Sequence, residues 1–323
     1  MGLFNFLTKF HDRFGESCKE EIHPCDELRE AVSLVVKLSH PNIHYVPDYR
    51  EKLMPAVEHT LKFADDLILQ MPAPVSVEED SWDTNPFIRT VFPDNRQFAD
   101  FFSQDRTLKE FFDKTNAPGC CALLVMTRRD RQIFGTEMEG ELLKRDVLQT
   151  SIDFSDHQIV APMTSEEETR KELSLRMLEL LATHALEDML SLTEWKKEME
   201  TQKHLLEMKL HIRDARFHSI NSLFPGRQDT EIPDGALEVL EQLEQKIAKV
   251  RTETDEPEDY LSRVTDLLYH PEQFVRPEPI RMFVNAMNIL VEDQEKGDEI
   301  CFSEFSIGTQ LRKAAALVDC KRF

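Results

Sequence analysis

The chain has 323 residues, 41% hydrophobic and 31% charged, a length and composition typical of a folded protein with two or three domains. Its 39 basic and 61 acidic residues give a formal charge of −22, which argues against nucleic-acid binding because a polyanion is bound through a concentrated basic face. The six cysteines follow no disulfide framework, no secretory signal is apparent, and no apolar run is long enough to span a bilayer. We therefore expect a cytoplasmic protein that does not bind nucleic acid.

The N-terminal segment, 1–20, is expected to contain a short amphipathic helix. Its apolar residues share one helical face: Leu3, Phe4, Leu7, Phe10 and Phe14. This face is compatible with weak peripheral membrane contact, with packing on the protein's own core, or with binding a partner. We favour packing on the helical core over 26–70.

Residues 21–163 are expected to form a helical region followed by an antiparallel sheet. Two helices precede a proline-rich acidic linker at 71–86, and two short Phe-rich helices follow near 98–102 and 108–112. We expect the aromatic side chains of these two short helices in the core, because an aromatic stripe at helical spacing is more often core than a ligand site.

The spacing of apolar residues changes to that of strands after Gly119. Strands are expected at 120–127, 132–137, 146–154 and 158–162, separated by short charged or turn-like sequences. Connections this short predict an antiparallel meander, with one face packed on the Phe-rich helices.

The segment 164–255 is expected to form a long antiparallel helical hairpin. Thr164 and Glu167 match a capping box, and neither glycine nor proline follows before Pro225. A helix over 165–216 would be about 75 Å long at the usual rise of about 1.5 Å per residue.

A heptad lattice predicts a coiled-coil-like seam between the two helices of the hairpin. The expected seam residues are Leu192, Trp195, Met199, Leu206, Ala236, Leu240, Leu243, Ile247 and Val250. Asp188 and Gln202 fall on the same lattice and argue against a long homodimeric coiled coil, so we expect a monomer with an intrachain hairpin. A second stripe, interpreted as drift of the seam, comprises Leu205, Met208, Ile212 and Ala215.

The C-terminal segment, 256–323, is expected to be a small α+β module. It has one helix at 257–269, followed by strands at 280–291, 299–307 and 311–319. The complete chain is thus predicted to be α+β and predominantly helical, with N-terminal helices, a small antiparallel sheet, the hairpin and this module.

Metal-ligating side chains occur, but without the spacing of a metal site. Four of them lie near the N-terminus and match no zinc finger: His11, Cys18, His23 and Cys25. Three more recur every seven residues on the long helix, too far apart in rise for one ion: His204, His211 and His218. We therefore predict no metal ligand.

Motifs for catalysis or cofactor binding are also missing. The sequence has no glycine-rich nucleotide-binding loop, nucleophile elbow or zinc-protease motif. Two clusters are candidates for an active site, Asp153-Asp156-His157 at an expected turn and Cys120-Cys121 at the start of a strand. Neither supplies a nucleophile, a base and an orienting group, so we predict no catalytic residue and no cofactor.

The leading hypothesis is a non-enzymatic interaction or scaffold protein that presents the helical hairpin to a protein partner. The alternative is a sensory or regulatory module, in which the sheet at 120–162 binds a small ligand and the long helix signals or dimerises. An enzyme of unrecognised class is a third hypothesis, because a folded active site need not show a local motif.

Overall fold

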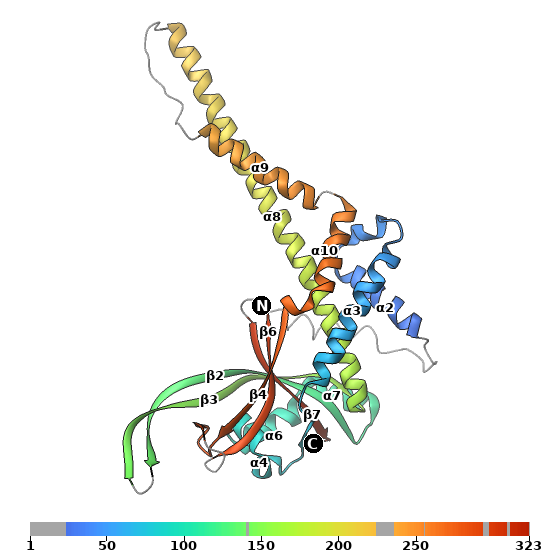
Figure 1. Ribbon diagram of the computed structural model, residues 1–323, viewed down its shortest axis with the longest axis vertical. Helices are drawn as coiled ribbons and strands as arrows, with labels where there is room; N and C mark the ends of the chain where they lie inside the picture. The colour runs from blue at the N-terminus through green and yellow to red at the C-terminus, as the bar shows by residue number, and fades with distance from the viewer. Residues whose placement is uncertain are drawn as a thin grey trace. The chain divides into compact units, whose positions relative to one another are not determined.

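A computed structural model of the chain describes residues 24–139, 142–223, 236–254, 256–292, 297–308 and 311–322. These residues form two compact units, each assembled from segments that are distant in sequence (Figure 1). A sheet unit contains 60–177 and 270–322, and a helical unit contains 24–59 and 178–269. The predicted α+β, predominantly helical fold class is confirmed.

The sheet unit is built on one seven-stranded sheet, in the order β3-β2-β7-β6-β4-β5 with β1 paired in parallel to β7. Its strands are β1 (Val75–Val77), β2 (Gly119–Glu139), β3 (Leu142–Met163), β4 (Val275–Val284), β5 (Leu290–Val291), β6 (Asp298–Ile307) and β7 (Leu311–Lys321). All the other neighbouring strands are antiparallel. Since β7 lies between β2 and β6, the last strands complete the sheet that β2 and β3 begin. The segment 256–323 is therefore divided between the two units and does not form a module of its own.

Strands β2 and β3 form one long hairpin where four shorter strands were expected. Arg129 and Asp130 pair with Asp153 and Ile152, so they lie inside β2 and not at a turn. Asp156, at the other expected turn, has a φ of 56° and lies beside a register shift in the ladder. A β-bulge at this point accommodates the turn-like residues without ending the strand.

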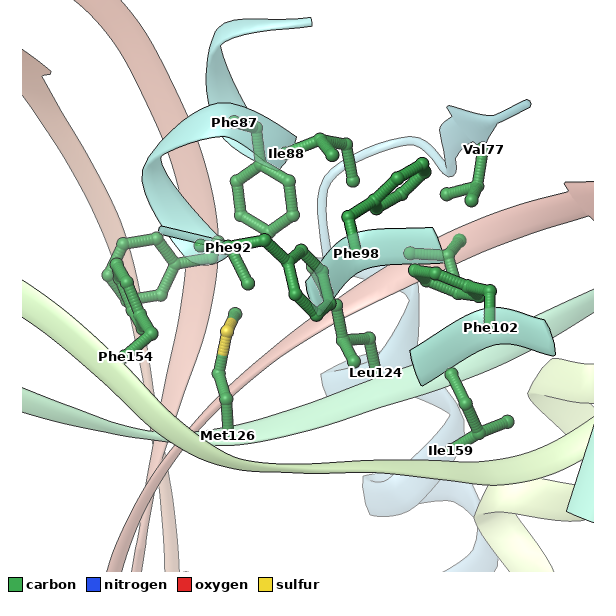
Figure 2. Packing of buried hydrophobic residues seen from close by; sticks show 14 of the residues in the cluster. Val77, Phe87, Ile88, Phe92, Phe98, Phe102, Leu124, Met126, Phe154 and Ile159 are labelled. Atoms are coloured by element: carbon green, nitrogen blue, oxygen red, sulfur yellow. The ribbon is translucent and has the colours of Figure 1, made fainter. Parts of the chain in front are cut away.

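Short helices cover one face of the sheet and fill its core with phenylalanine (Figure 2). They are α4 (Ser81–Thr84), α5 (Pro86–Val91), α6 (Asn95–Gln104) and α7 (Arg106–Thr115). Asp94 and Asp105 cap α6 and α7, because their carboxylates accept hydrogen bonds from the third N–H of each helix at 2.8 and 2.9 Å. The rings of Phe92, Phe98 and Phe102 lie over sheet residues in one cluster, with Phe98 fully buried. The Phe-rich helices are therefore core elements, as predicted.

Over the described residues, the helical unit contains three complete α-helices, α2, α9 and α10, and one end of each of two others, α3 and α8. The helices are α2 (Pro24–Leu38), α3 (Tyr49–Leu69), α8 (Glu166–Leu223), α9 (Ala236–Thr254) and α10 (Pro257–Tyr269). Short 3-10 helices lie at Pro41–Tyr45 in this unit and at Pro271–Gln273 in the sheet unit. Near the first of these, the ring of His40 stacks on Tyr260 of α10 with centroids 4.0 Å apart. Helices α3 and α8 each have one end in the sheet unit and the other in the helical unit.

The start of α8 differs from the expected capping box by one residue. The helix begins at Glu166, and the hydroxyl of Ser165 accepts a hydrogen bond from the N–H of Glu168 at 3.2 Å. Ser165 is thus the N-cap, while the Thr164 hydroxyl bonds the side chain of Glu168. The carboxylates of the first turn still complement the positive end of the helix dipole, as the sequence indicated.

Candidate partner surface on the helical hairpin

Helices α8 and α9 pair as an antiparallel hairpin. Glu200 of α8 bonds Arg251 of α9 at 2.9 Å, and Lys203 of α8 bonds Glu244 of α9 at 2.8 Å. A later residue on α8 thus pairs with an earlier residue on α9, which requires opposite directions. On α9 three expected seam residues are buried: Leu243, Ile247 and Val250.

The side of α8 that forms the seam differs in part from the predicted lattice. Its seam positions are half-buried and alternate in spacing between four and three: Leu192, Lys196, Met199, Lys203, Leu206 and Leu210. The predicted and the observed seam coincide at every seventh residue, at Leu192, Met199 and Leu206. Between these positions the prediction takes Trp195 and Gln202, whereas the half-buried residues are the adjacent Lys196 and Lys203. At those intervening positions Asp188 and Gln202 are exposed, and Trp195 is 37% exposed at the border of the seam. The two polar residues are therefore surface residues, and the argument drawn from them about homodimers does not apply.

Lysine can occupy the seam because its stem and its ammonium group have different surroundings. The Lys203 side chain is only 29% exposed, while its ammonium bonds Glu244 and lies 3.6 Å from Glu207. The hydrogen bond with Glu244 is the main reason that the pKa of Lys203 is raised. A lattice chosen by hydrophobicity alone selects Trp195 instead of Lys196. The sequence signal for the observed seam was the opposite charge of facing residues on the two helices, as in the pair of Lys203 with Glu244.

A cleft of about 340 Å³ lies between α8 and α9 beside these ion pairs. It is lined by Glu200, Lys203, His204, Glu207, Glu244, Ile247, Ala248 and Arg251. Both lining cations, Lys203 and Arg251, are paired with carboxylates of the lining. The cleft is accordingly the solvated edge of the seam, with its charge satisfied internally.

A row of large apolar side chains runs along the opposite side of α8. Leu205, Met208 and Ile212 are 48%, 43% and 55% exposed, and Ala215 continues the row. Ile212 follows Lys203 by nine residues, which at about 100° per residue places it about 180° around the helix. The row, which we name the outward stripe, thus faces away from α9 and is not the drift of the seam that its sequence pattern suggested.

The side chains beside the outward stripe are basic or imidazole groups. His204 and His211 lie one turn before and one turn after Met208, and Lys209 lies one turn after Leu205. Glu207, by contrast, lies on the seam side next to Lys203. The stripe is therefore an apolar strip bordered by one lysine and two imidazole side chains, on a chain whose formal charge is −22.

The Asp153-Asp156-His157 cluster does not form an acid–base site. Asp153 lies 3.4 Å from Arg131, and Asp156 lies 3.9 Å from Arg129. The His157 ring stacks on Phe92 with centroids 4.6 Å apart, and burial lowers its pKa. The three side chains therefore serve separate structural contacts.

A buried carboxylate marks the edge of the sheet core. Glu304 on β6 lies 3.1 Å from Arg312 of β7 and 3.9 Å from Arg128 of β2, and Arg128 also bonds Asp130. This cluster joins three strands through opposite charges, because a buried carboxylate is costly without a cationic partner. Sequence patterning did not indicate it, since Arg128 and Asp130 are far in the chain from Glu304 and Arg312.

Several sequence-predicted positions lie outside the described residues. These are the N-terminal face of Leu3, Phe4, Leu7, Phe10 and Phe14, three of the four possible zinc ligands (His11, Cys18 and His23), and the side chains of Cys25, Ala236 and His218. The N-terminal helix and its contacts stay a prediction.

No protein-family model matches the chain, and neither a curated protein nor a solved structure matches it. Among the residues that the structure describes, no helix combines the length and apolarity needed to cross a membrane. Over the same ranges, no group of three or more His, Cys, Asp or Glu side chains is arranged to hold a metal ion.

Proposed function

We propose that the protein is a non-enzymatic interaction protein, and that α8 presents its outward stripe to an amphipathic helix of a protein partner. The observation that carries this proposal is the exposure of Leu205, Met208 and Ile212 in one row that α9 does not cover. Single exposed apolar residues are ordinary, whereas a contiguous row of them is typical of an interaction surface. Their spacing of three and four residues suits the apolar face of a second helix.

The charge around the stripe indicates the chemistry of the partner. Lys209 supplies a positive charge beside the stripe, and the two histidines supply ring nitrogens that can hydrogen-bond, so together they favour a partner helix whose apolar face is flanked by carboxylates. A second copy of this chain is a poorer fit, because it would present the same lysine and a like overall charge. We place this interaction in the cytoplasm, on the sparse cysteine spacing and the acidic composition of the chain.

The test uses the full chain as bait in a lysate of its source cells. The stripe variant is Met208→Asp with Ile212→Asp, and the control is Val239→Asp, which puts the same charge on an exposed apolar residue of α9. We expect quantitative mass spectrometry to show proteins that bind wild type and the control but not the stripe variant. The segment they share is then synthesised as a peptide, and its affinity for wild type should weaken with salt.

Two results count against the proposal. The first is a stripe variant that retains every wild-type partner while circular dichroism shows the same helix content as wild type. The second is a captured segment that lacks either an apolar helical face or flanking carboxylates. Deletion of 193–251 provides an independent check, because a hairpin-dependent interaction must be lost with it.

A further inference from the structure

Two cysteines from opposite ends of the sheet unit's sequence are neighbours in its core. The register of β2 and β7 places Cys120 directly opposite Cys320. Both are free thiols, both are buried, and both belong to the apolar cluster on the same face of the sheet. Cβ atoms of directly opposed residues in an antiparallel pair lie about 4.5–5.5 Å apart, close enough for their side chains to touch.

The hydrogen-bond pattern gives the separation of the two backbones. The N–H of Arg322 donates to the carbonyl of Pro118 at 3.2 Å, so these two residues are a hydrogen-bonded pair of the ladder. Hydrogen-bonded and non-hydrogen-bonded pairs alternate, and Cys120 with Cys320 lies two steps along, so it is again a hydrogen-bonded pair. The Cα atoms of such a pair are about 5.5 Å apart, inside the range of about 4.4–6.8 Å found in disulfides.

We propose that Cys120 and Cys320 are a redox site that forms a reversible cross-strand disulfide with a low-molecular-weight disulfide such as oxidised glutathione as the oxidant. One protein thiolate attacks a glutathione sulfur, the glutathione S–S bond breaks, and a mixed disulfide forms as one glutathione thiolate leaves. The second protein thiolate attacks the mixed disulfide at the protein sulfur and releases the other glutathione thiolate. Each leaving thiolate takes up a proton equivalent to the one lost by a protein thiol, so two protein thiols are oxidised and one glutathione disulfide is reduced.

The surroundings of the pair make this reaction slow until the end of the β2–β7 ladder opens. A hydrogen bond with the Cys120 thiol, together with burial, raises the pKa of Cys320, so little of Cys320 is present as thiolate in the closed sheet. Opening of the β2–β7 ladder near Gly119 and Lys321 exposes both sulfurs, and β1 is only three residues long where it borders Cys320. Opening therefore controls the rate, whereas the opposed positions of the two residues determine which disulfide forms.

Neighbouring cysteines provide internal controls. Cys121 is adjacent in sequence but faces the other side of β2, because successive side chains of a strand alternate. Cys301 lies on β6 opposite Arg281 and has no cysteine across the ladder. Neither is placed to bond Cys320 without a change of register.

The test is oxidation of the full chain in glutathione redox buffers, followed by acid quenching, alkylation of free thiols and digestion without reduction. We expect mass spectrometry to find one peptide pair linked through Cys120 and Cys320, which dithiothreitol releases and which forms several-fold faster in sub-denaturing urea. Cys301→Ser should leave this linkage unchanged, and Cys320→Ser should abolish it. Recovery of both residues as alkylated free thiols with and without urea would overturn the proposal. A stable glutathione adduct on either residue in wild type, without the linked pair, would overturn it as well.

Discussion

The position of the hairpin seam is tested by one substitution made on two faces of the same hairpin. Ile247 on α9 is 5% exposed and faces α8, whereas Ile212 on α8 is 55% exposed and lies on the outward stripe. Ile→Ala removes the same atoms at both positions and changes helix propensity by the same small amount. Any difference between the two variants therefore reports tertiary packing.

The expected difference follows from the buried area that each variant loses. Three buried carbon groups at about 0.8 kcal/mol each give about 2.4 kcal/mol for Ile247→Ala, and the residual cavity raises the cost to about 2.5–4 kcal/mol. Ile212→Ala removes groups already in contact with water, so its cost should stay within about 0.5 kcal/mol.

Hydrogen exchange of the α9 amides, at 236–254, measures this cost where it acts. Ile247→Ala should speed their exchange by about 30-fold or more, since about 1.4 kcal/mol corresponds to a factor of ten. Ile212→Ala should leave the exchange of α9 close to that of wild type. Equal acceleration by both variants, or a larger effect of Ile212→Ala, would refute the placement of Ile247 in the seam and of Ile212 outside it.

Two further predictions concern the sheet unit. Phe98→Ala should destabilise this unit by about 3–5 kcal/mol in chemical denaturation, because Phe98 is fully buried among Phe92 and Phe102. The control, Phe134→Ala, changes a residue that is 76% exposed on β2 and should cost no more than about 0.5 kcal/mol. Comparable costs for the two variants would contradict the assigned core. The second prediction is that the sheet unit loses stability in acid through His157. Burial lowers the pKa of His157 in the folded state, so the unfolded chain binds the proton more readily. The free energy of unfolding should therefore fall as pH drops below about 6.5. His157→Phe retains a ring against Phe92, and it should reduce the pH dependence of β3 amide exchange between about pH 7.5 and about pH 5.5. An unchanged slope would show that other groups cause the acid sensitivity.

Charge pairs give the hairpin a partner preference that apolar packing alone does not supply. A seam lysine on α8 meets a glutamate on α9, and Glu200 of α8 meets Arg251 of α9. Two copies of α8 aligned in parallel would bring lysines together at the same seam positions, which disfavours that pairing. The pairs are exposed enough that their contribution is to specificity more than to stability.

Local patterning was sufficient for most of the helices. The apolar spacing of 98–102 and 108–112, the long interval without glycine or proline before Pro225, and the regular stripe of α9 each depend on residues a few positions apart. Helices are stabilised by contacts three and four residues apart, so their sequence carries the signal directly. The outward stripe was also visible in the sequence, although its direction was not.

Tertiary structure decided the features that depend on residues distant in the chain. The pairing of β7 with β2 joins segments about 200 residues apart and brings Cys120 opposite Cys320, and together with the pairing of β1 to β7 it unites two expected modules in one sheet. The side of α8 that forms the seam depended on its contact with α9, where Lys203 pairs with Glu244. Sequence by itself determined most of the helices and which residues of the strands are apolar, because those signals are local, but it did not determine where β2 and β3 begin and end. Which faces meet, and therefore which face of α8 stays exposed, was decided by contacts between residues that are distant in the chain.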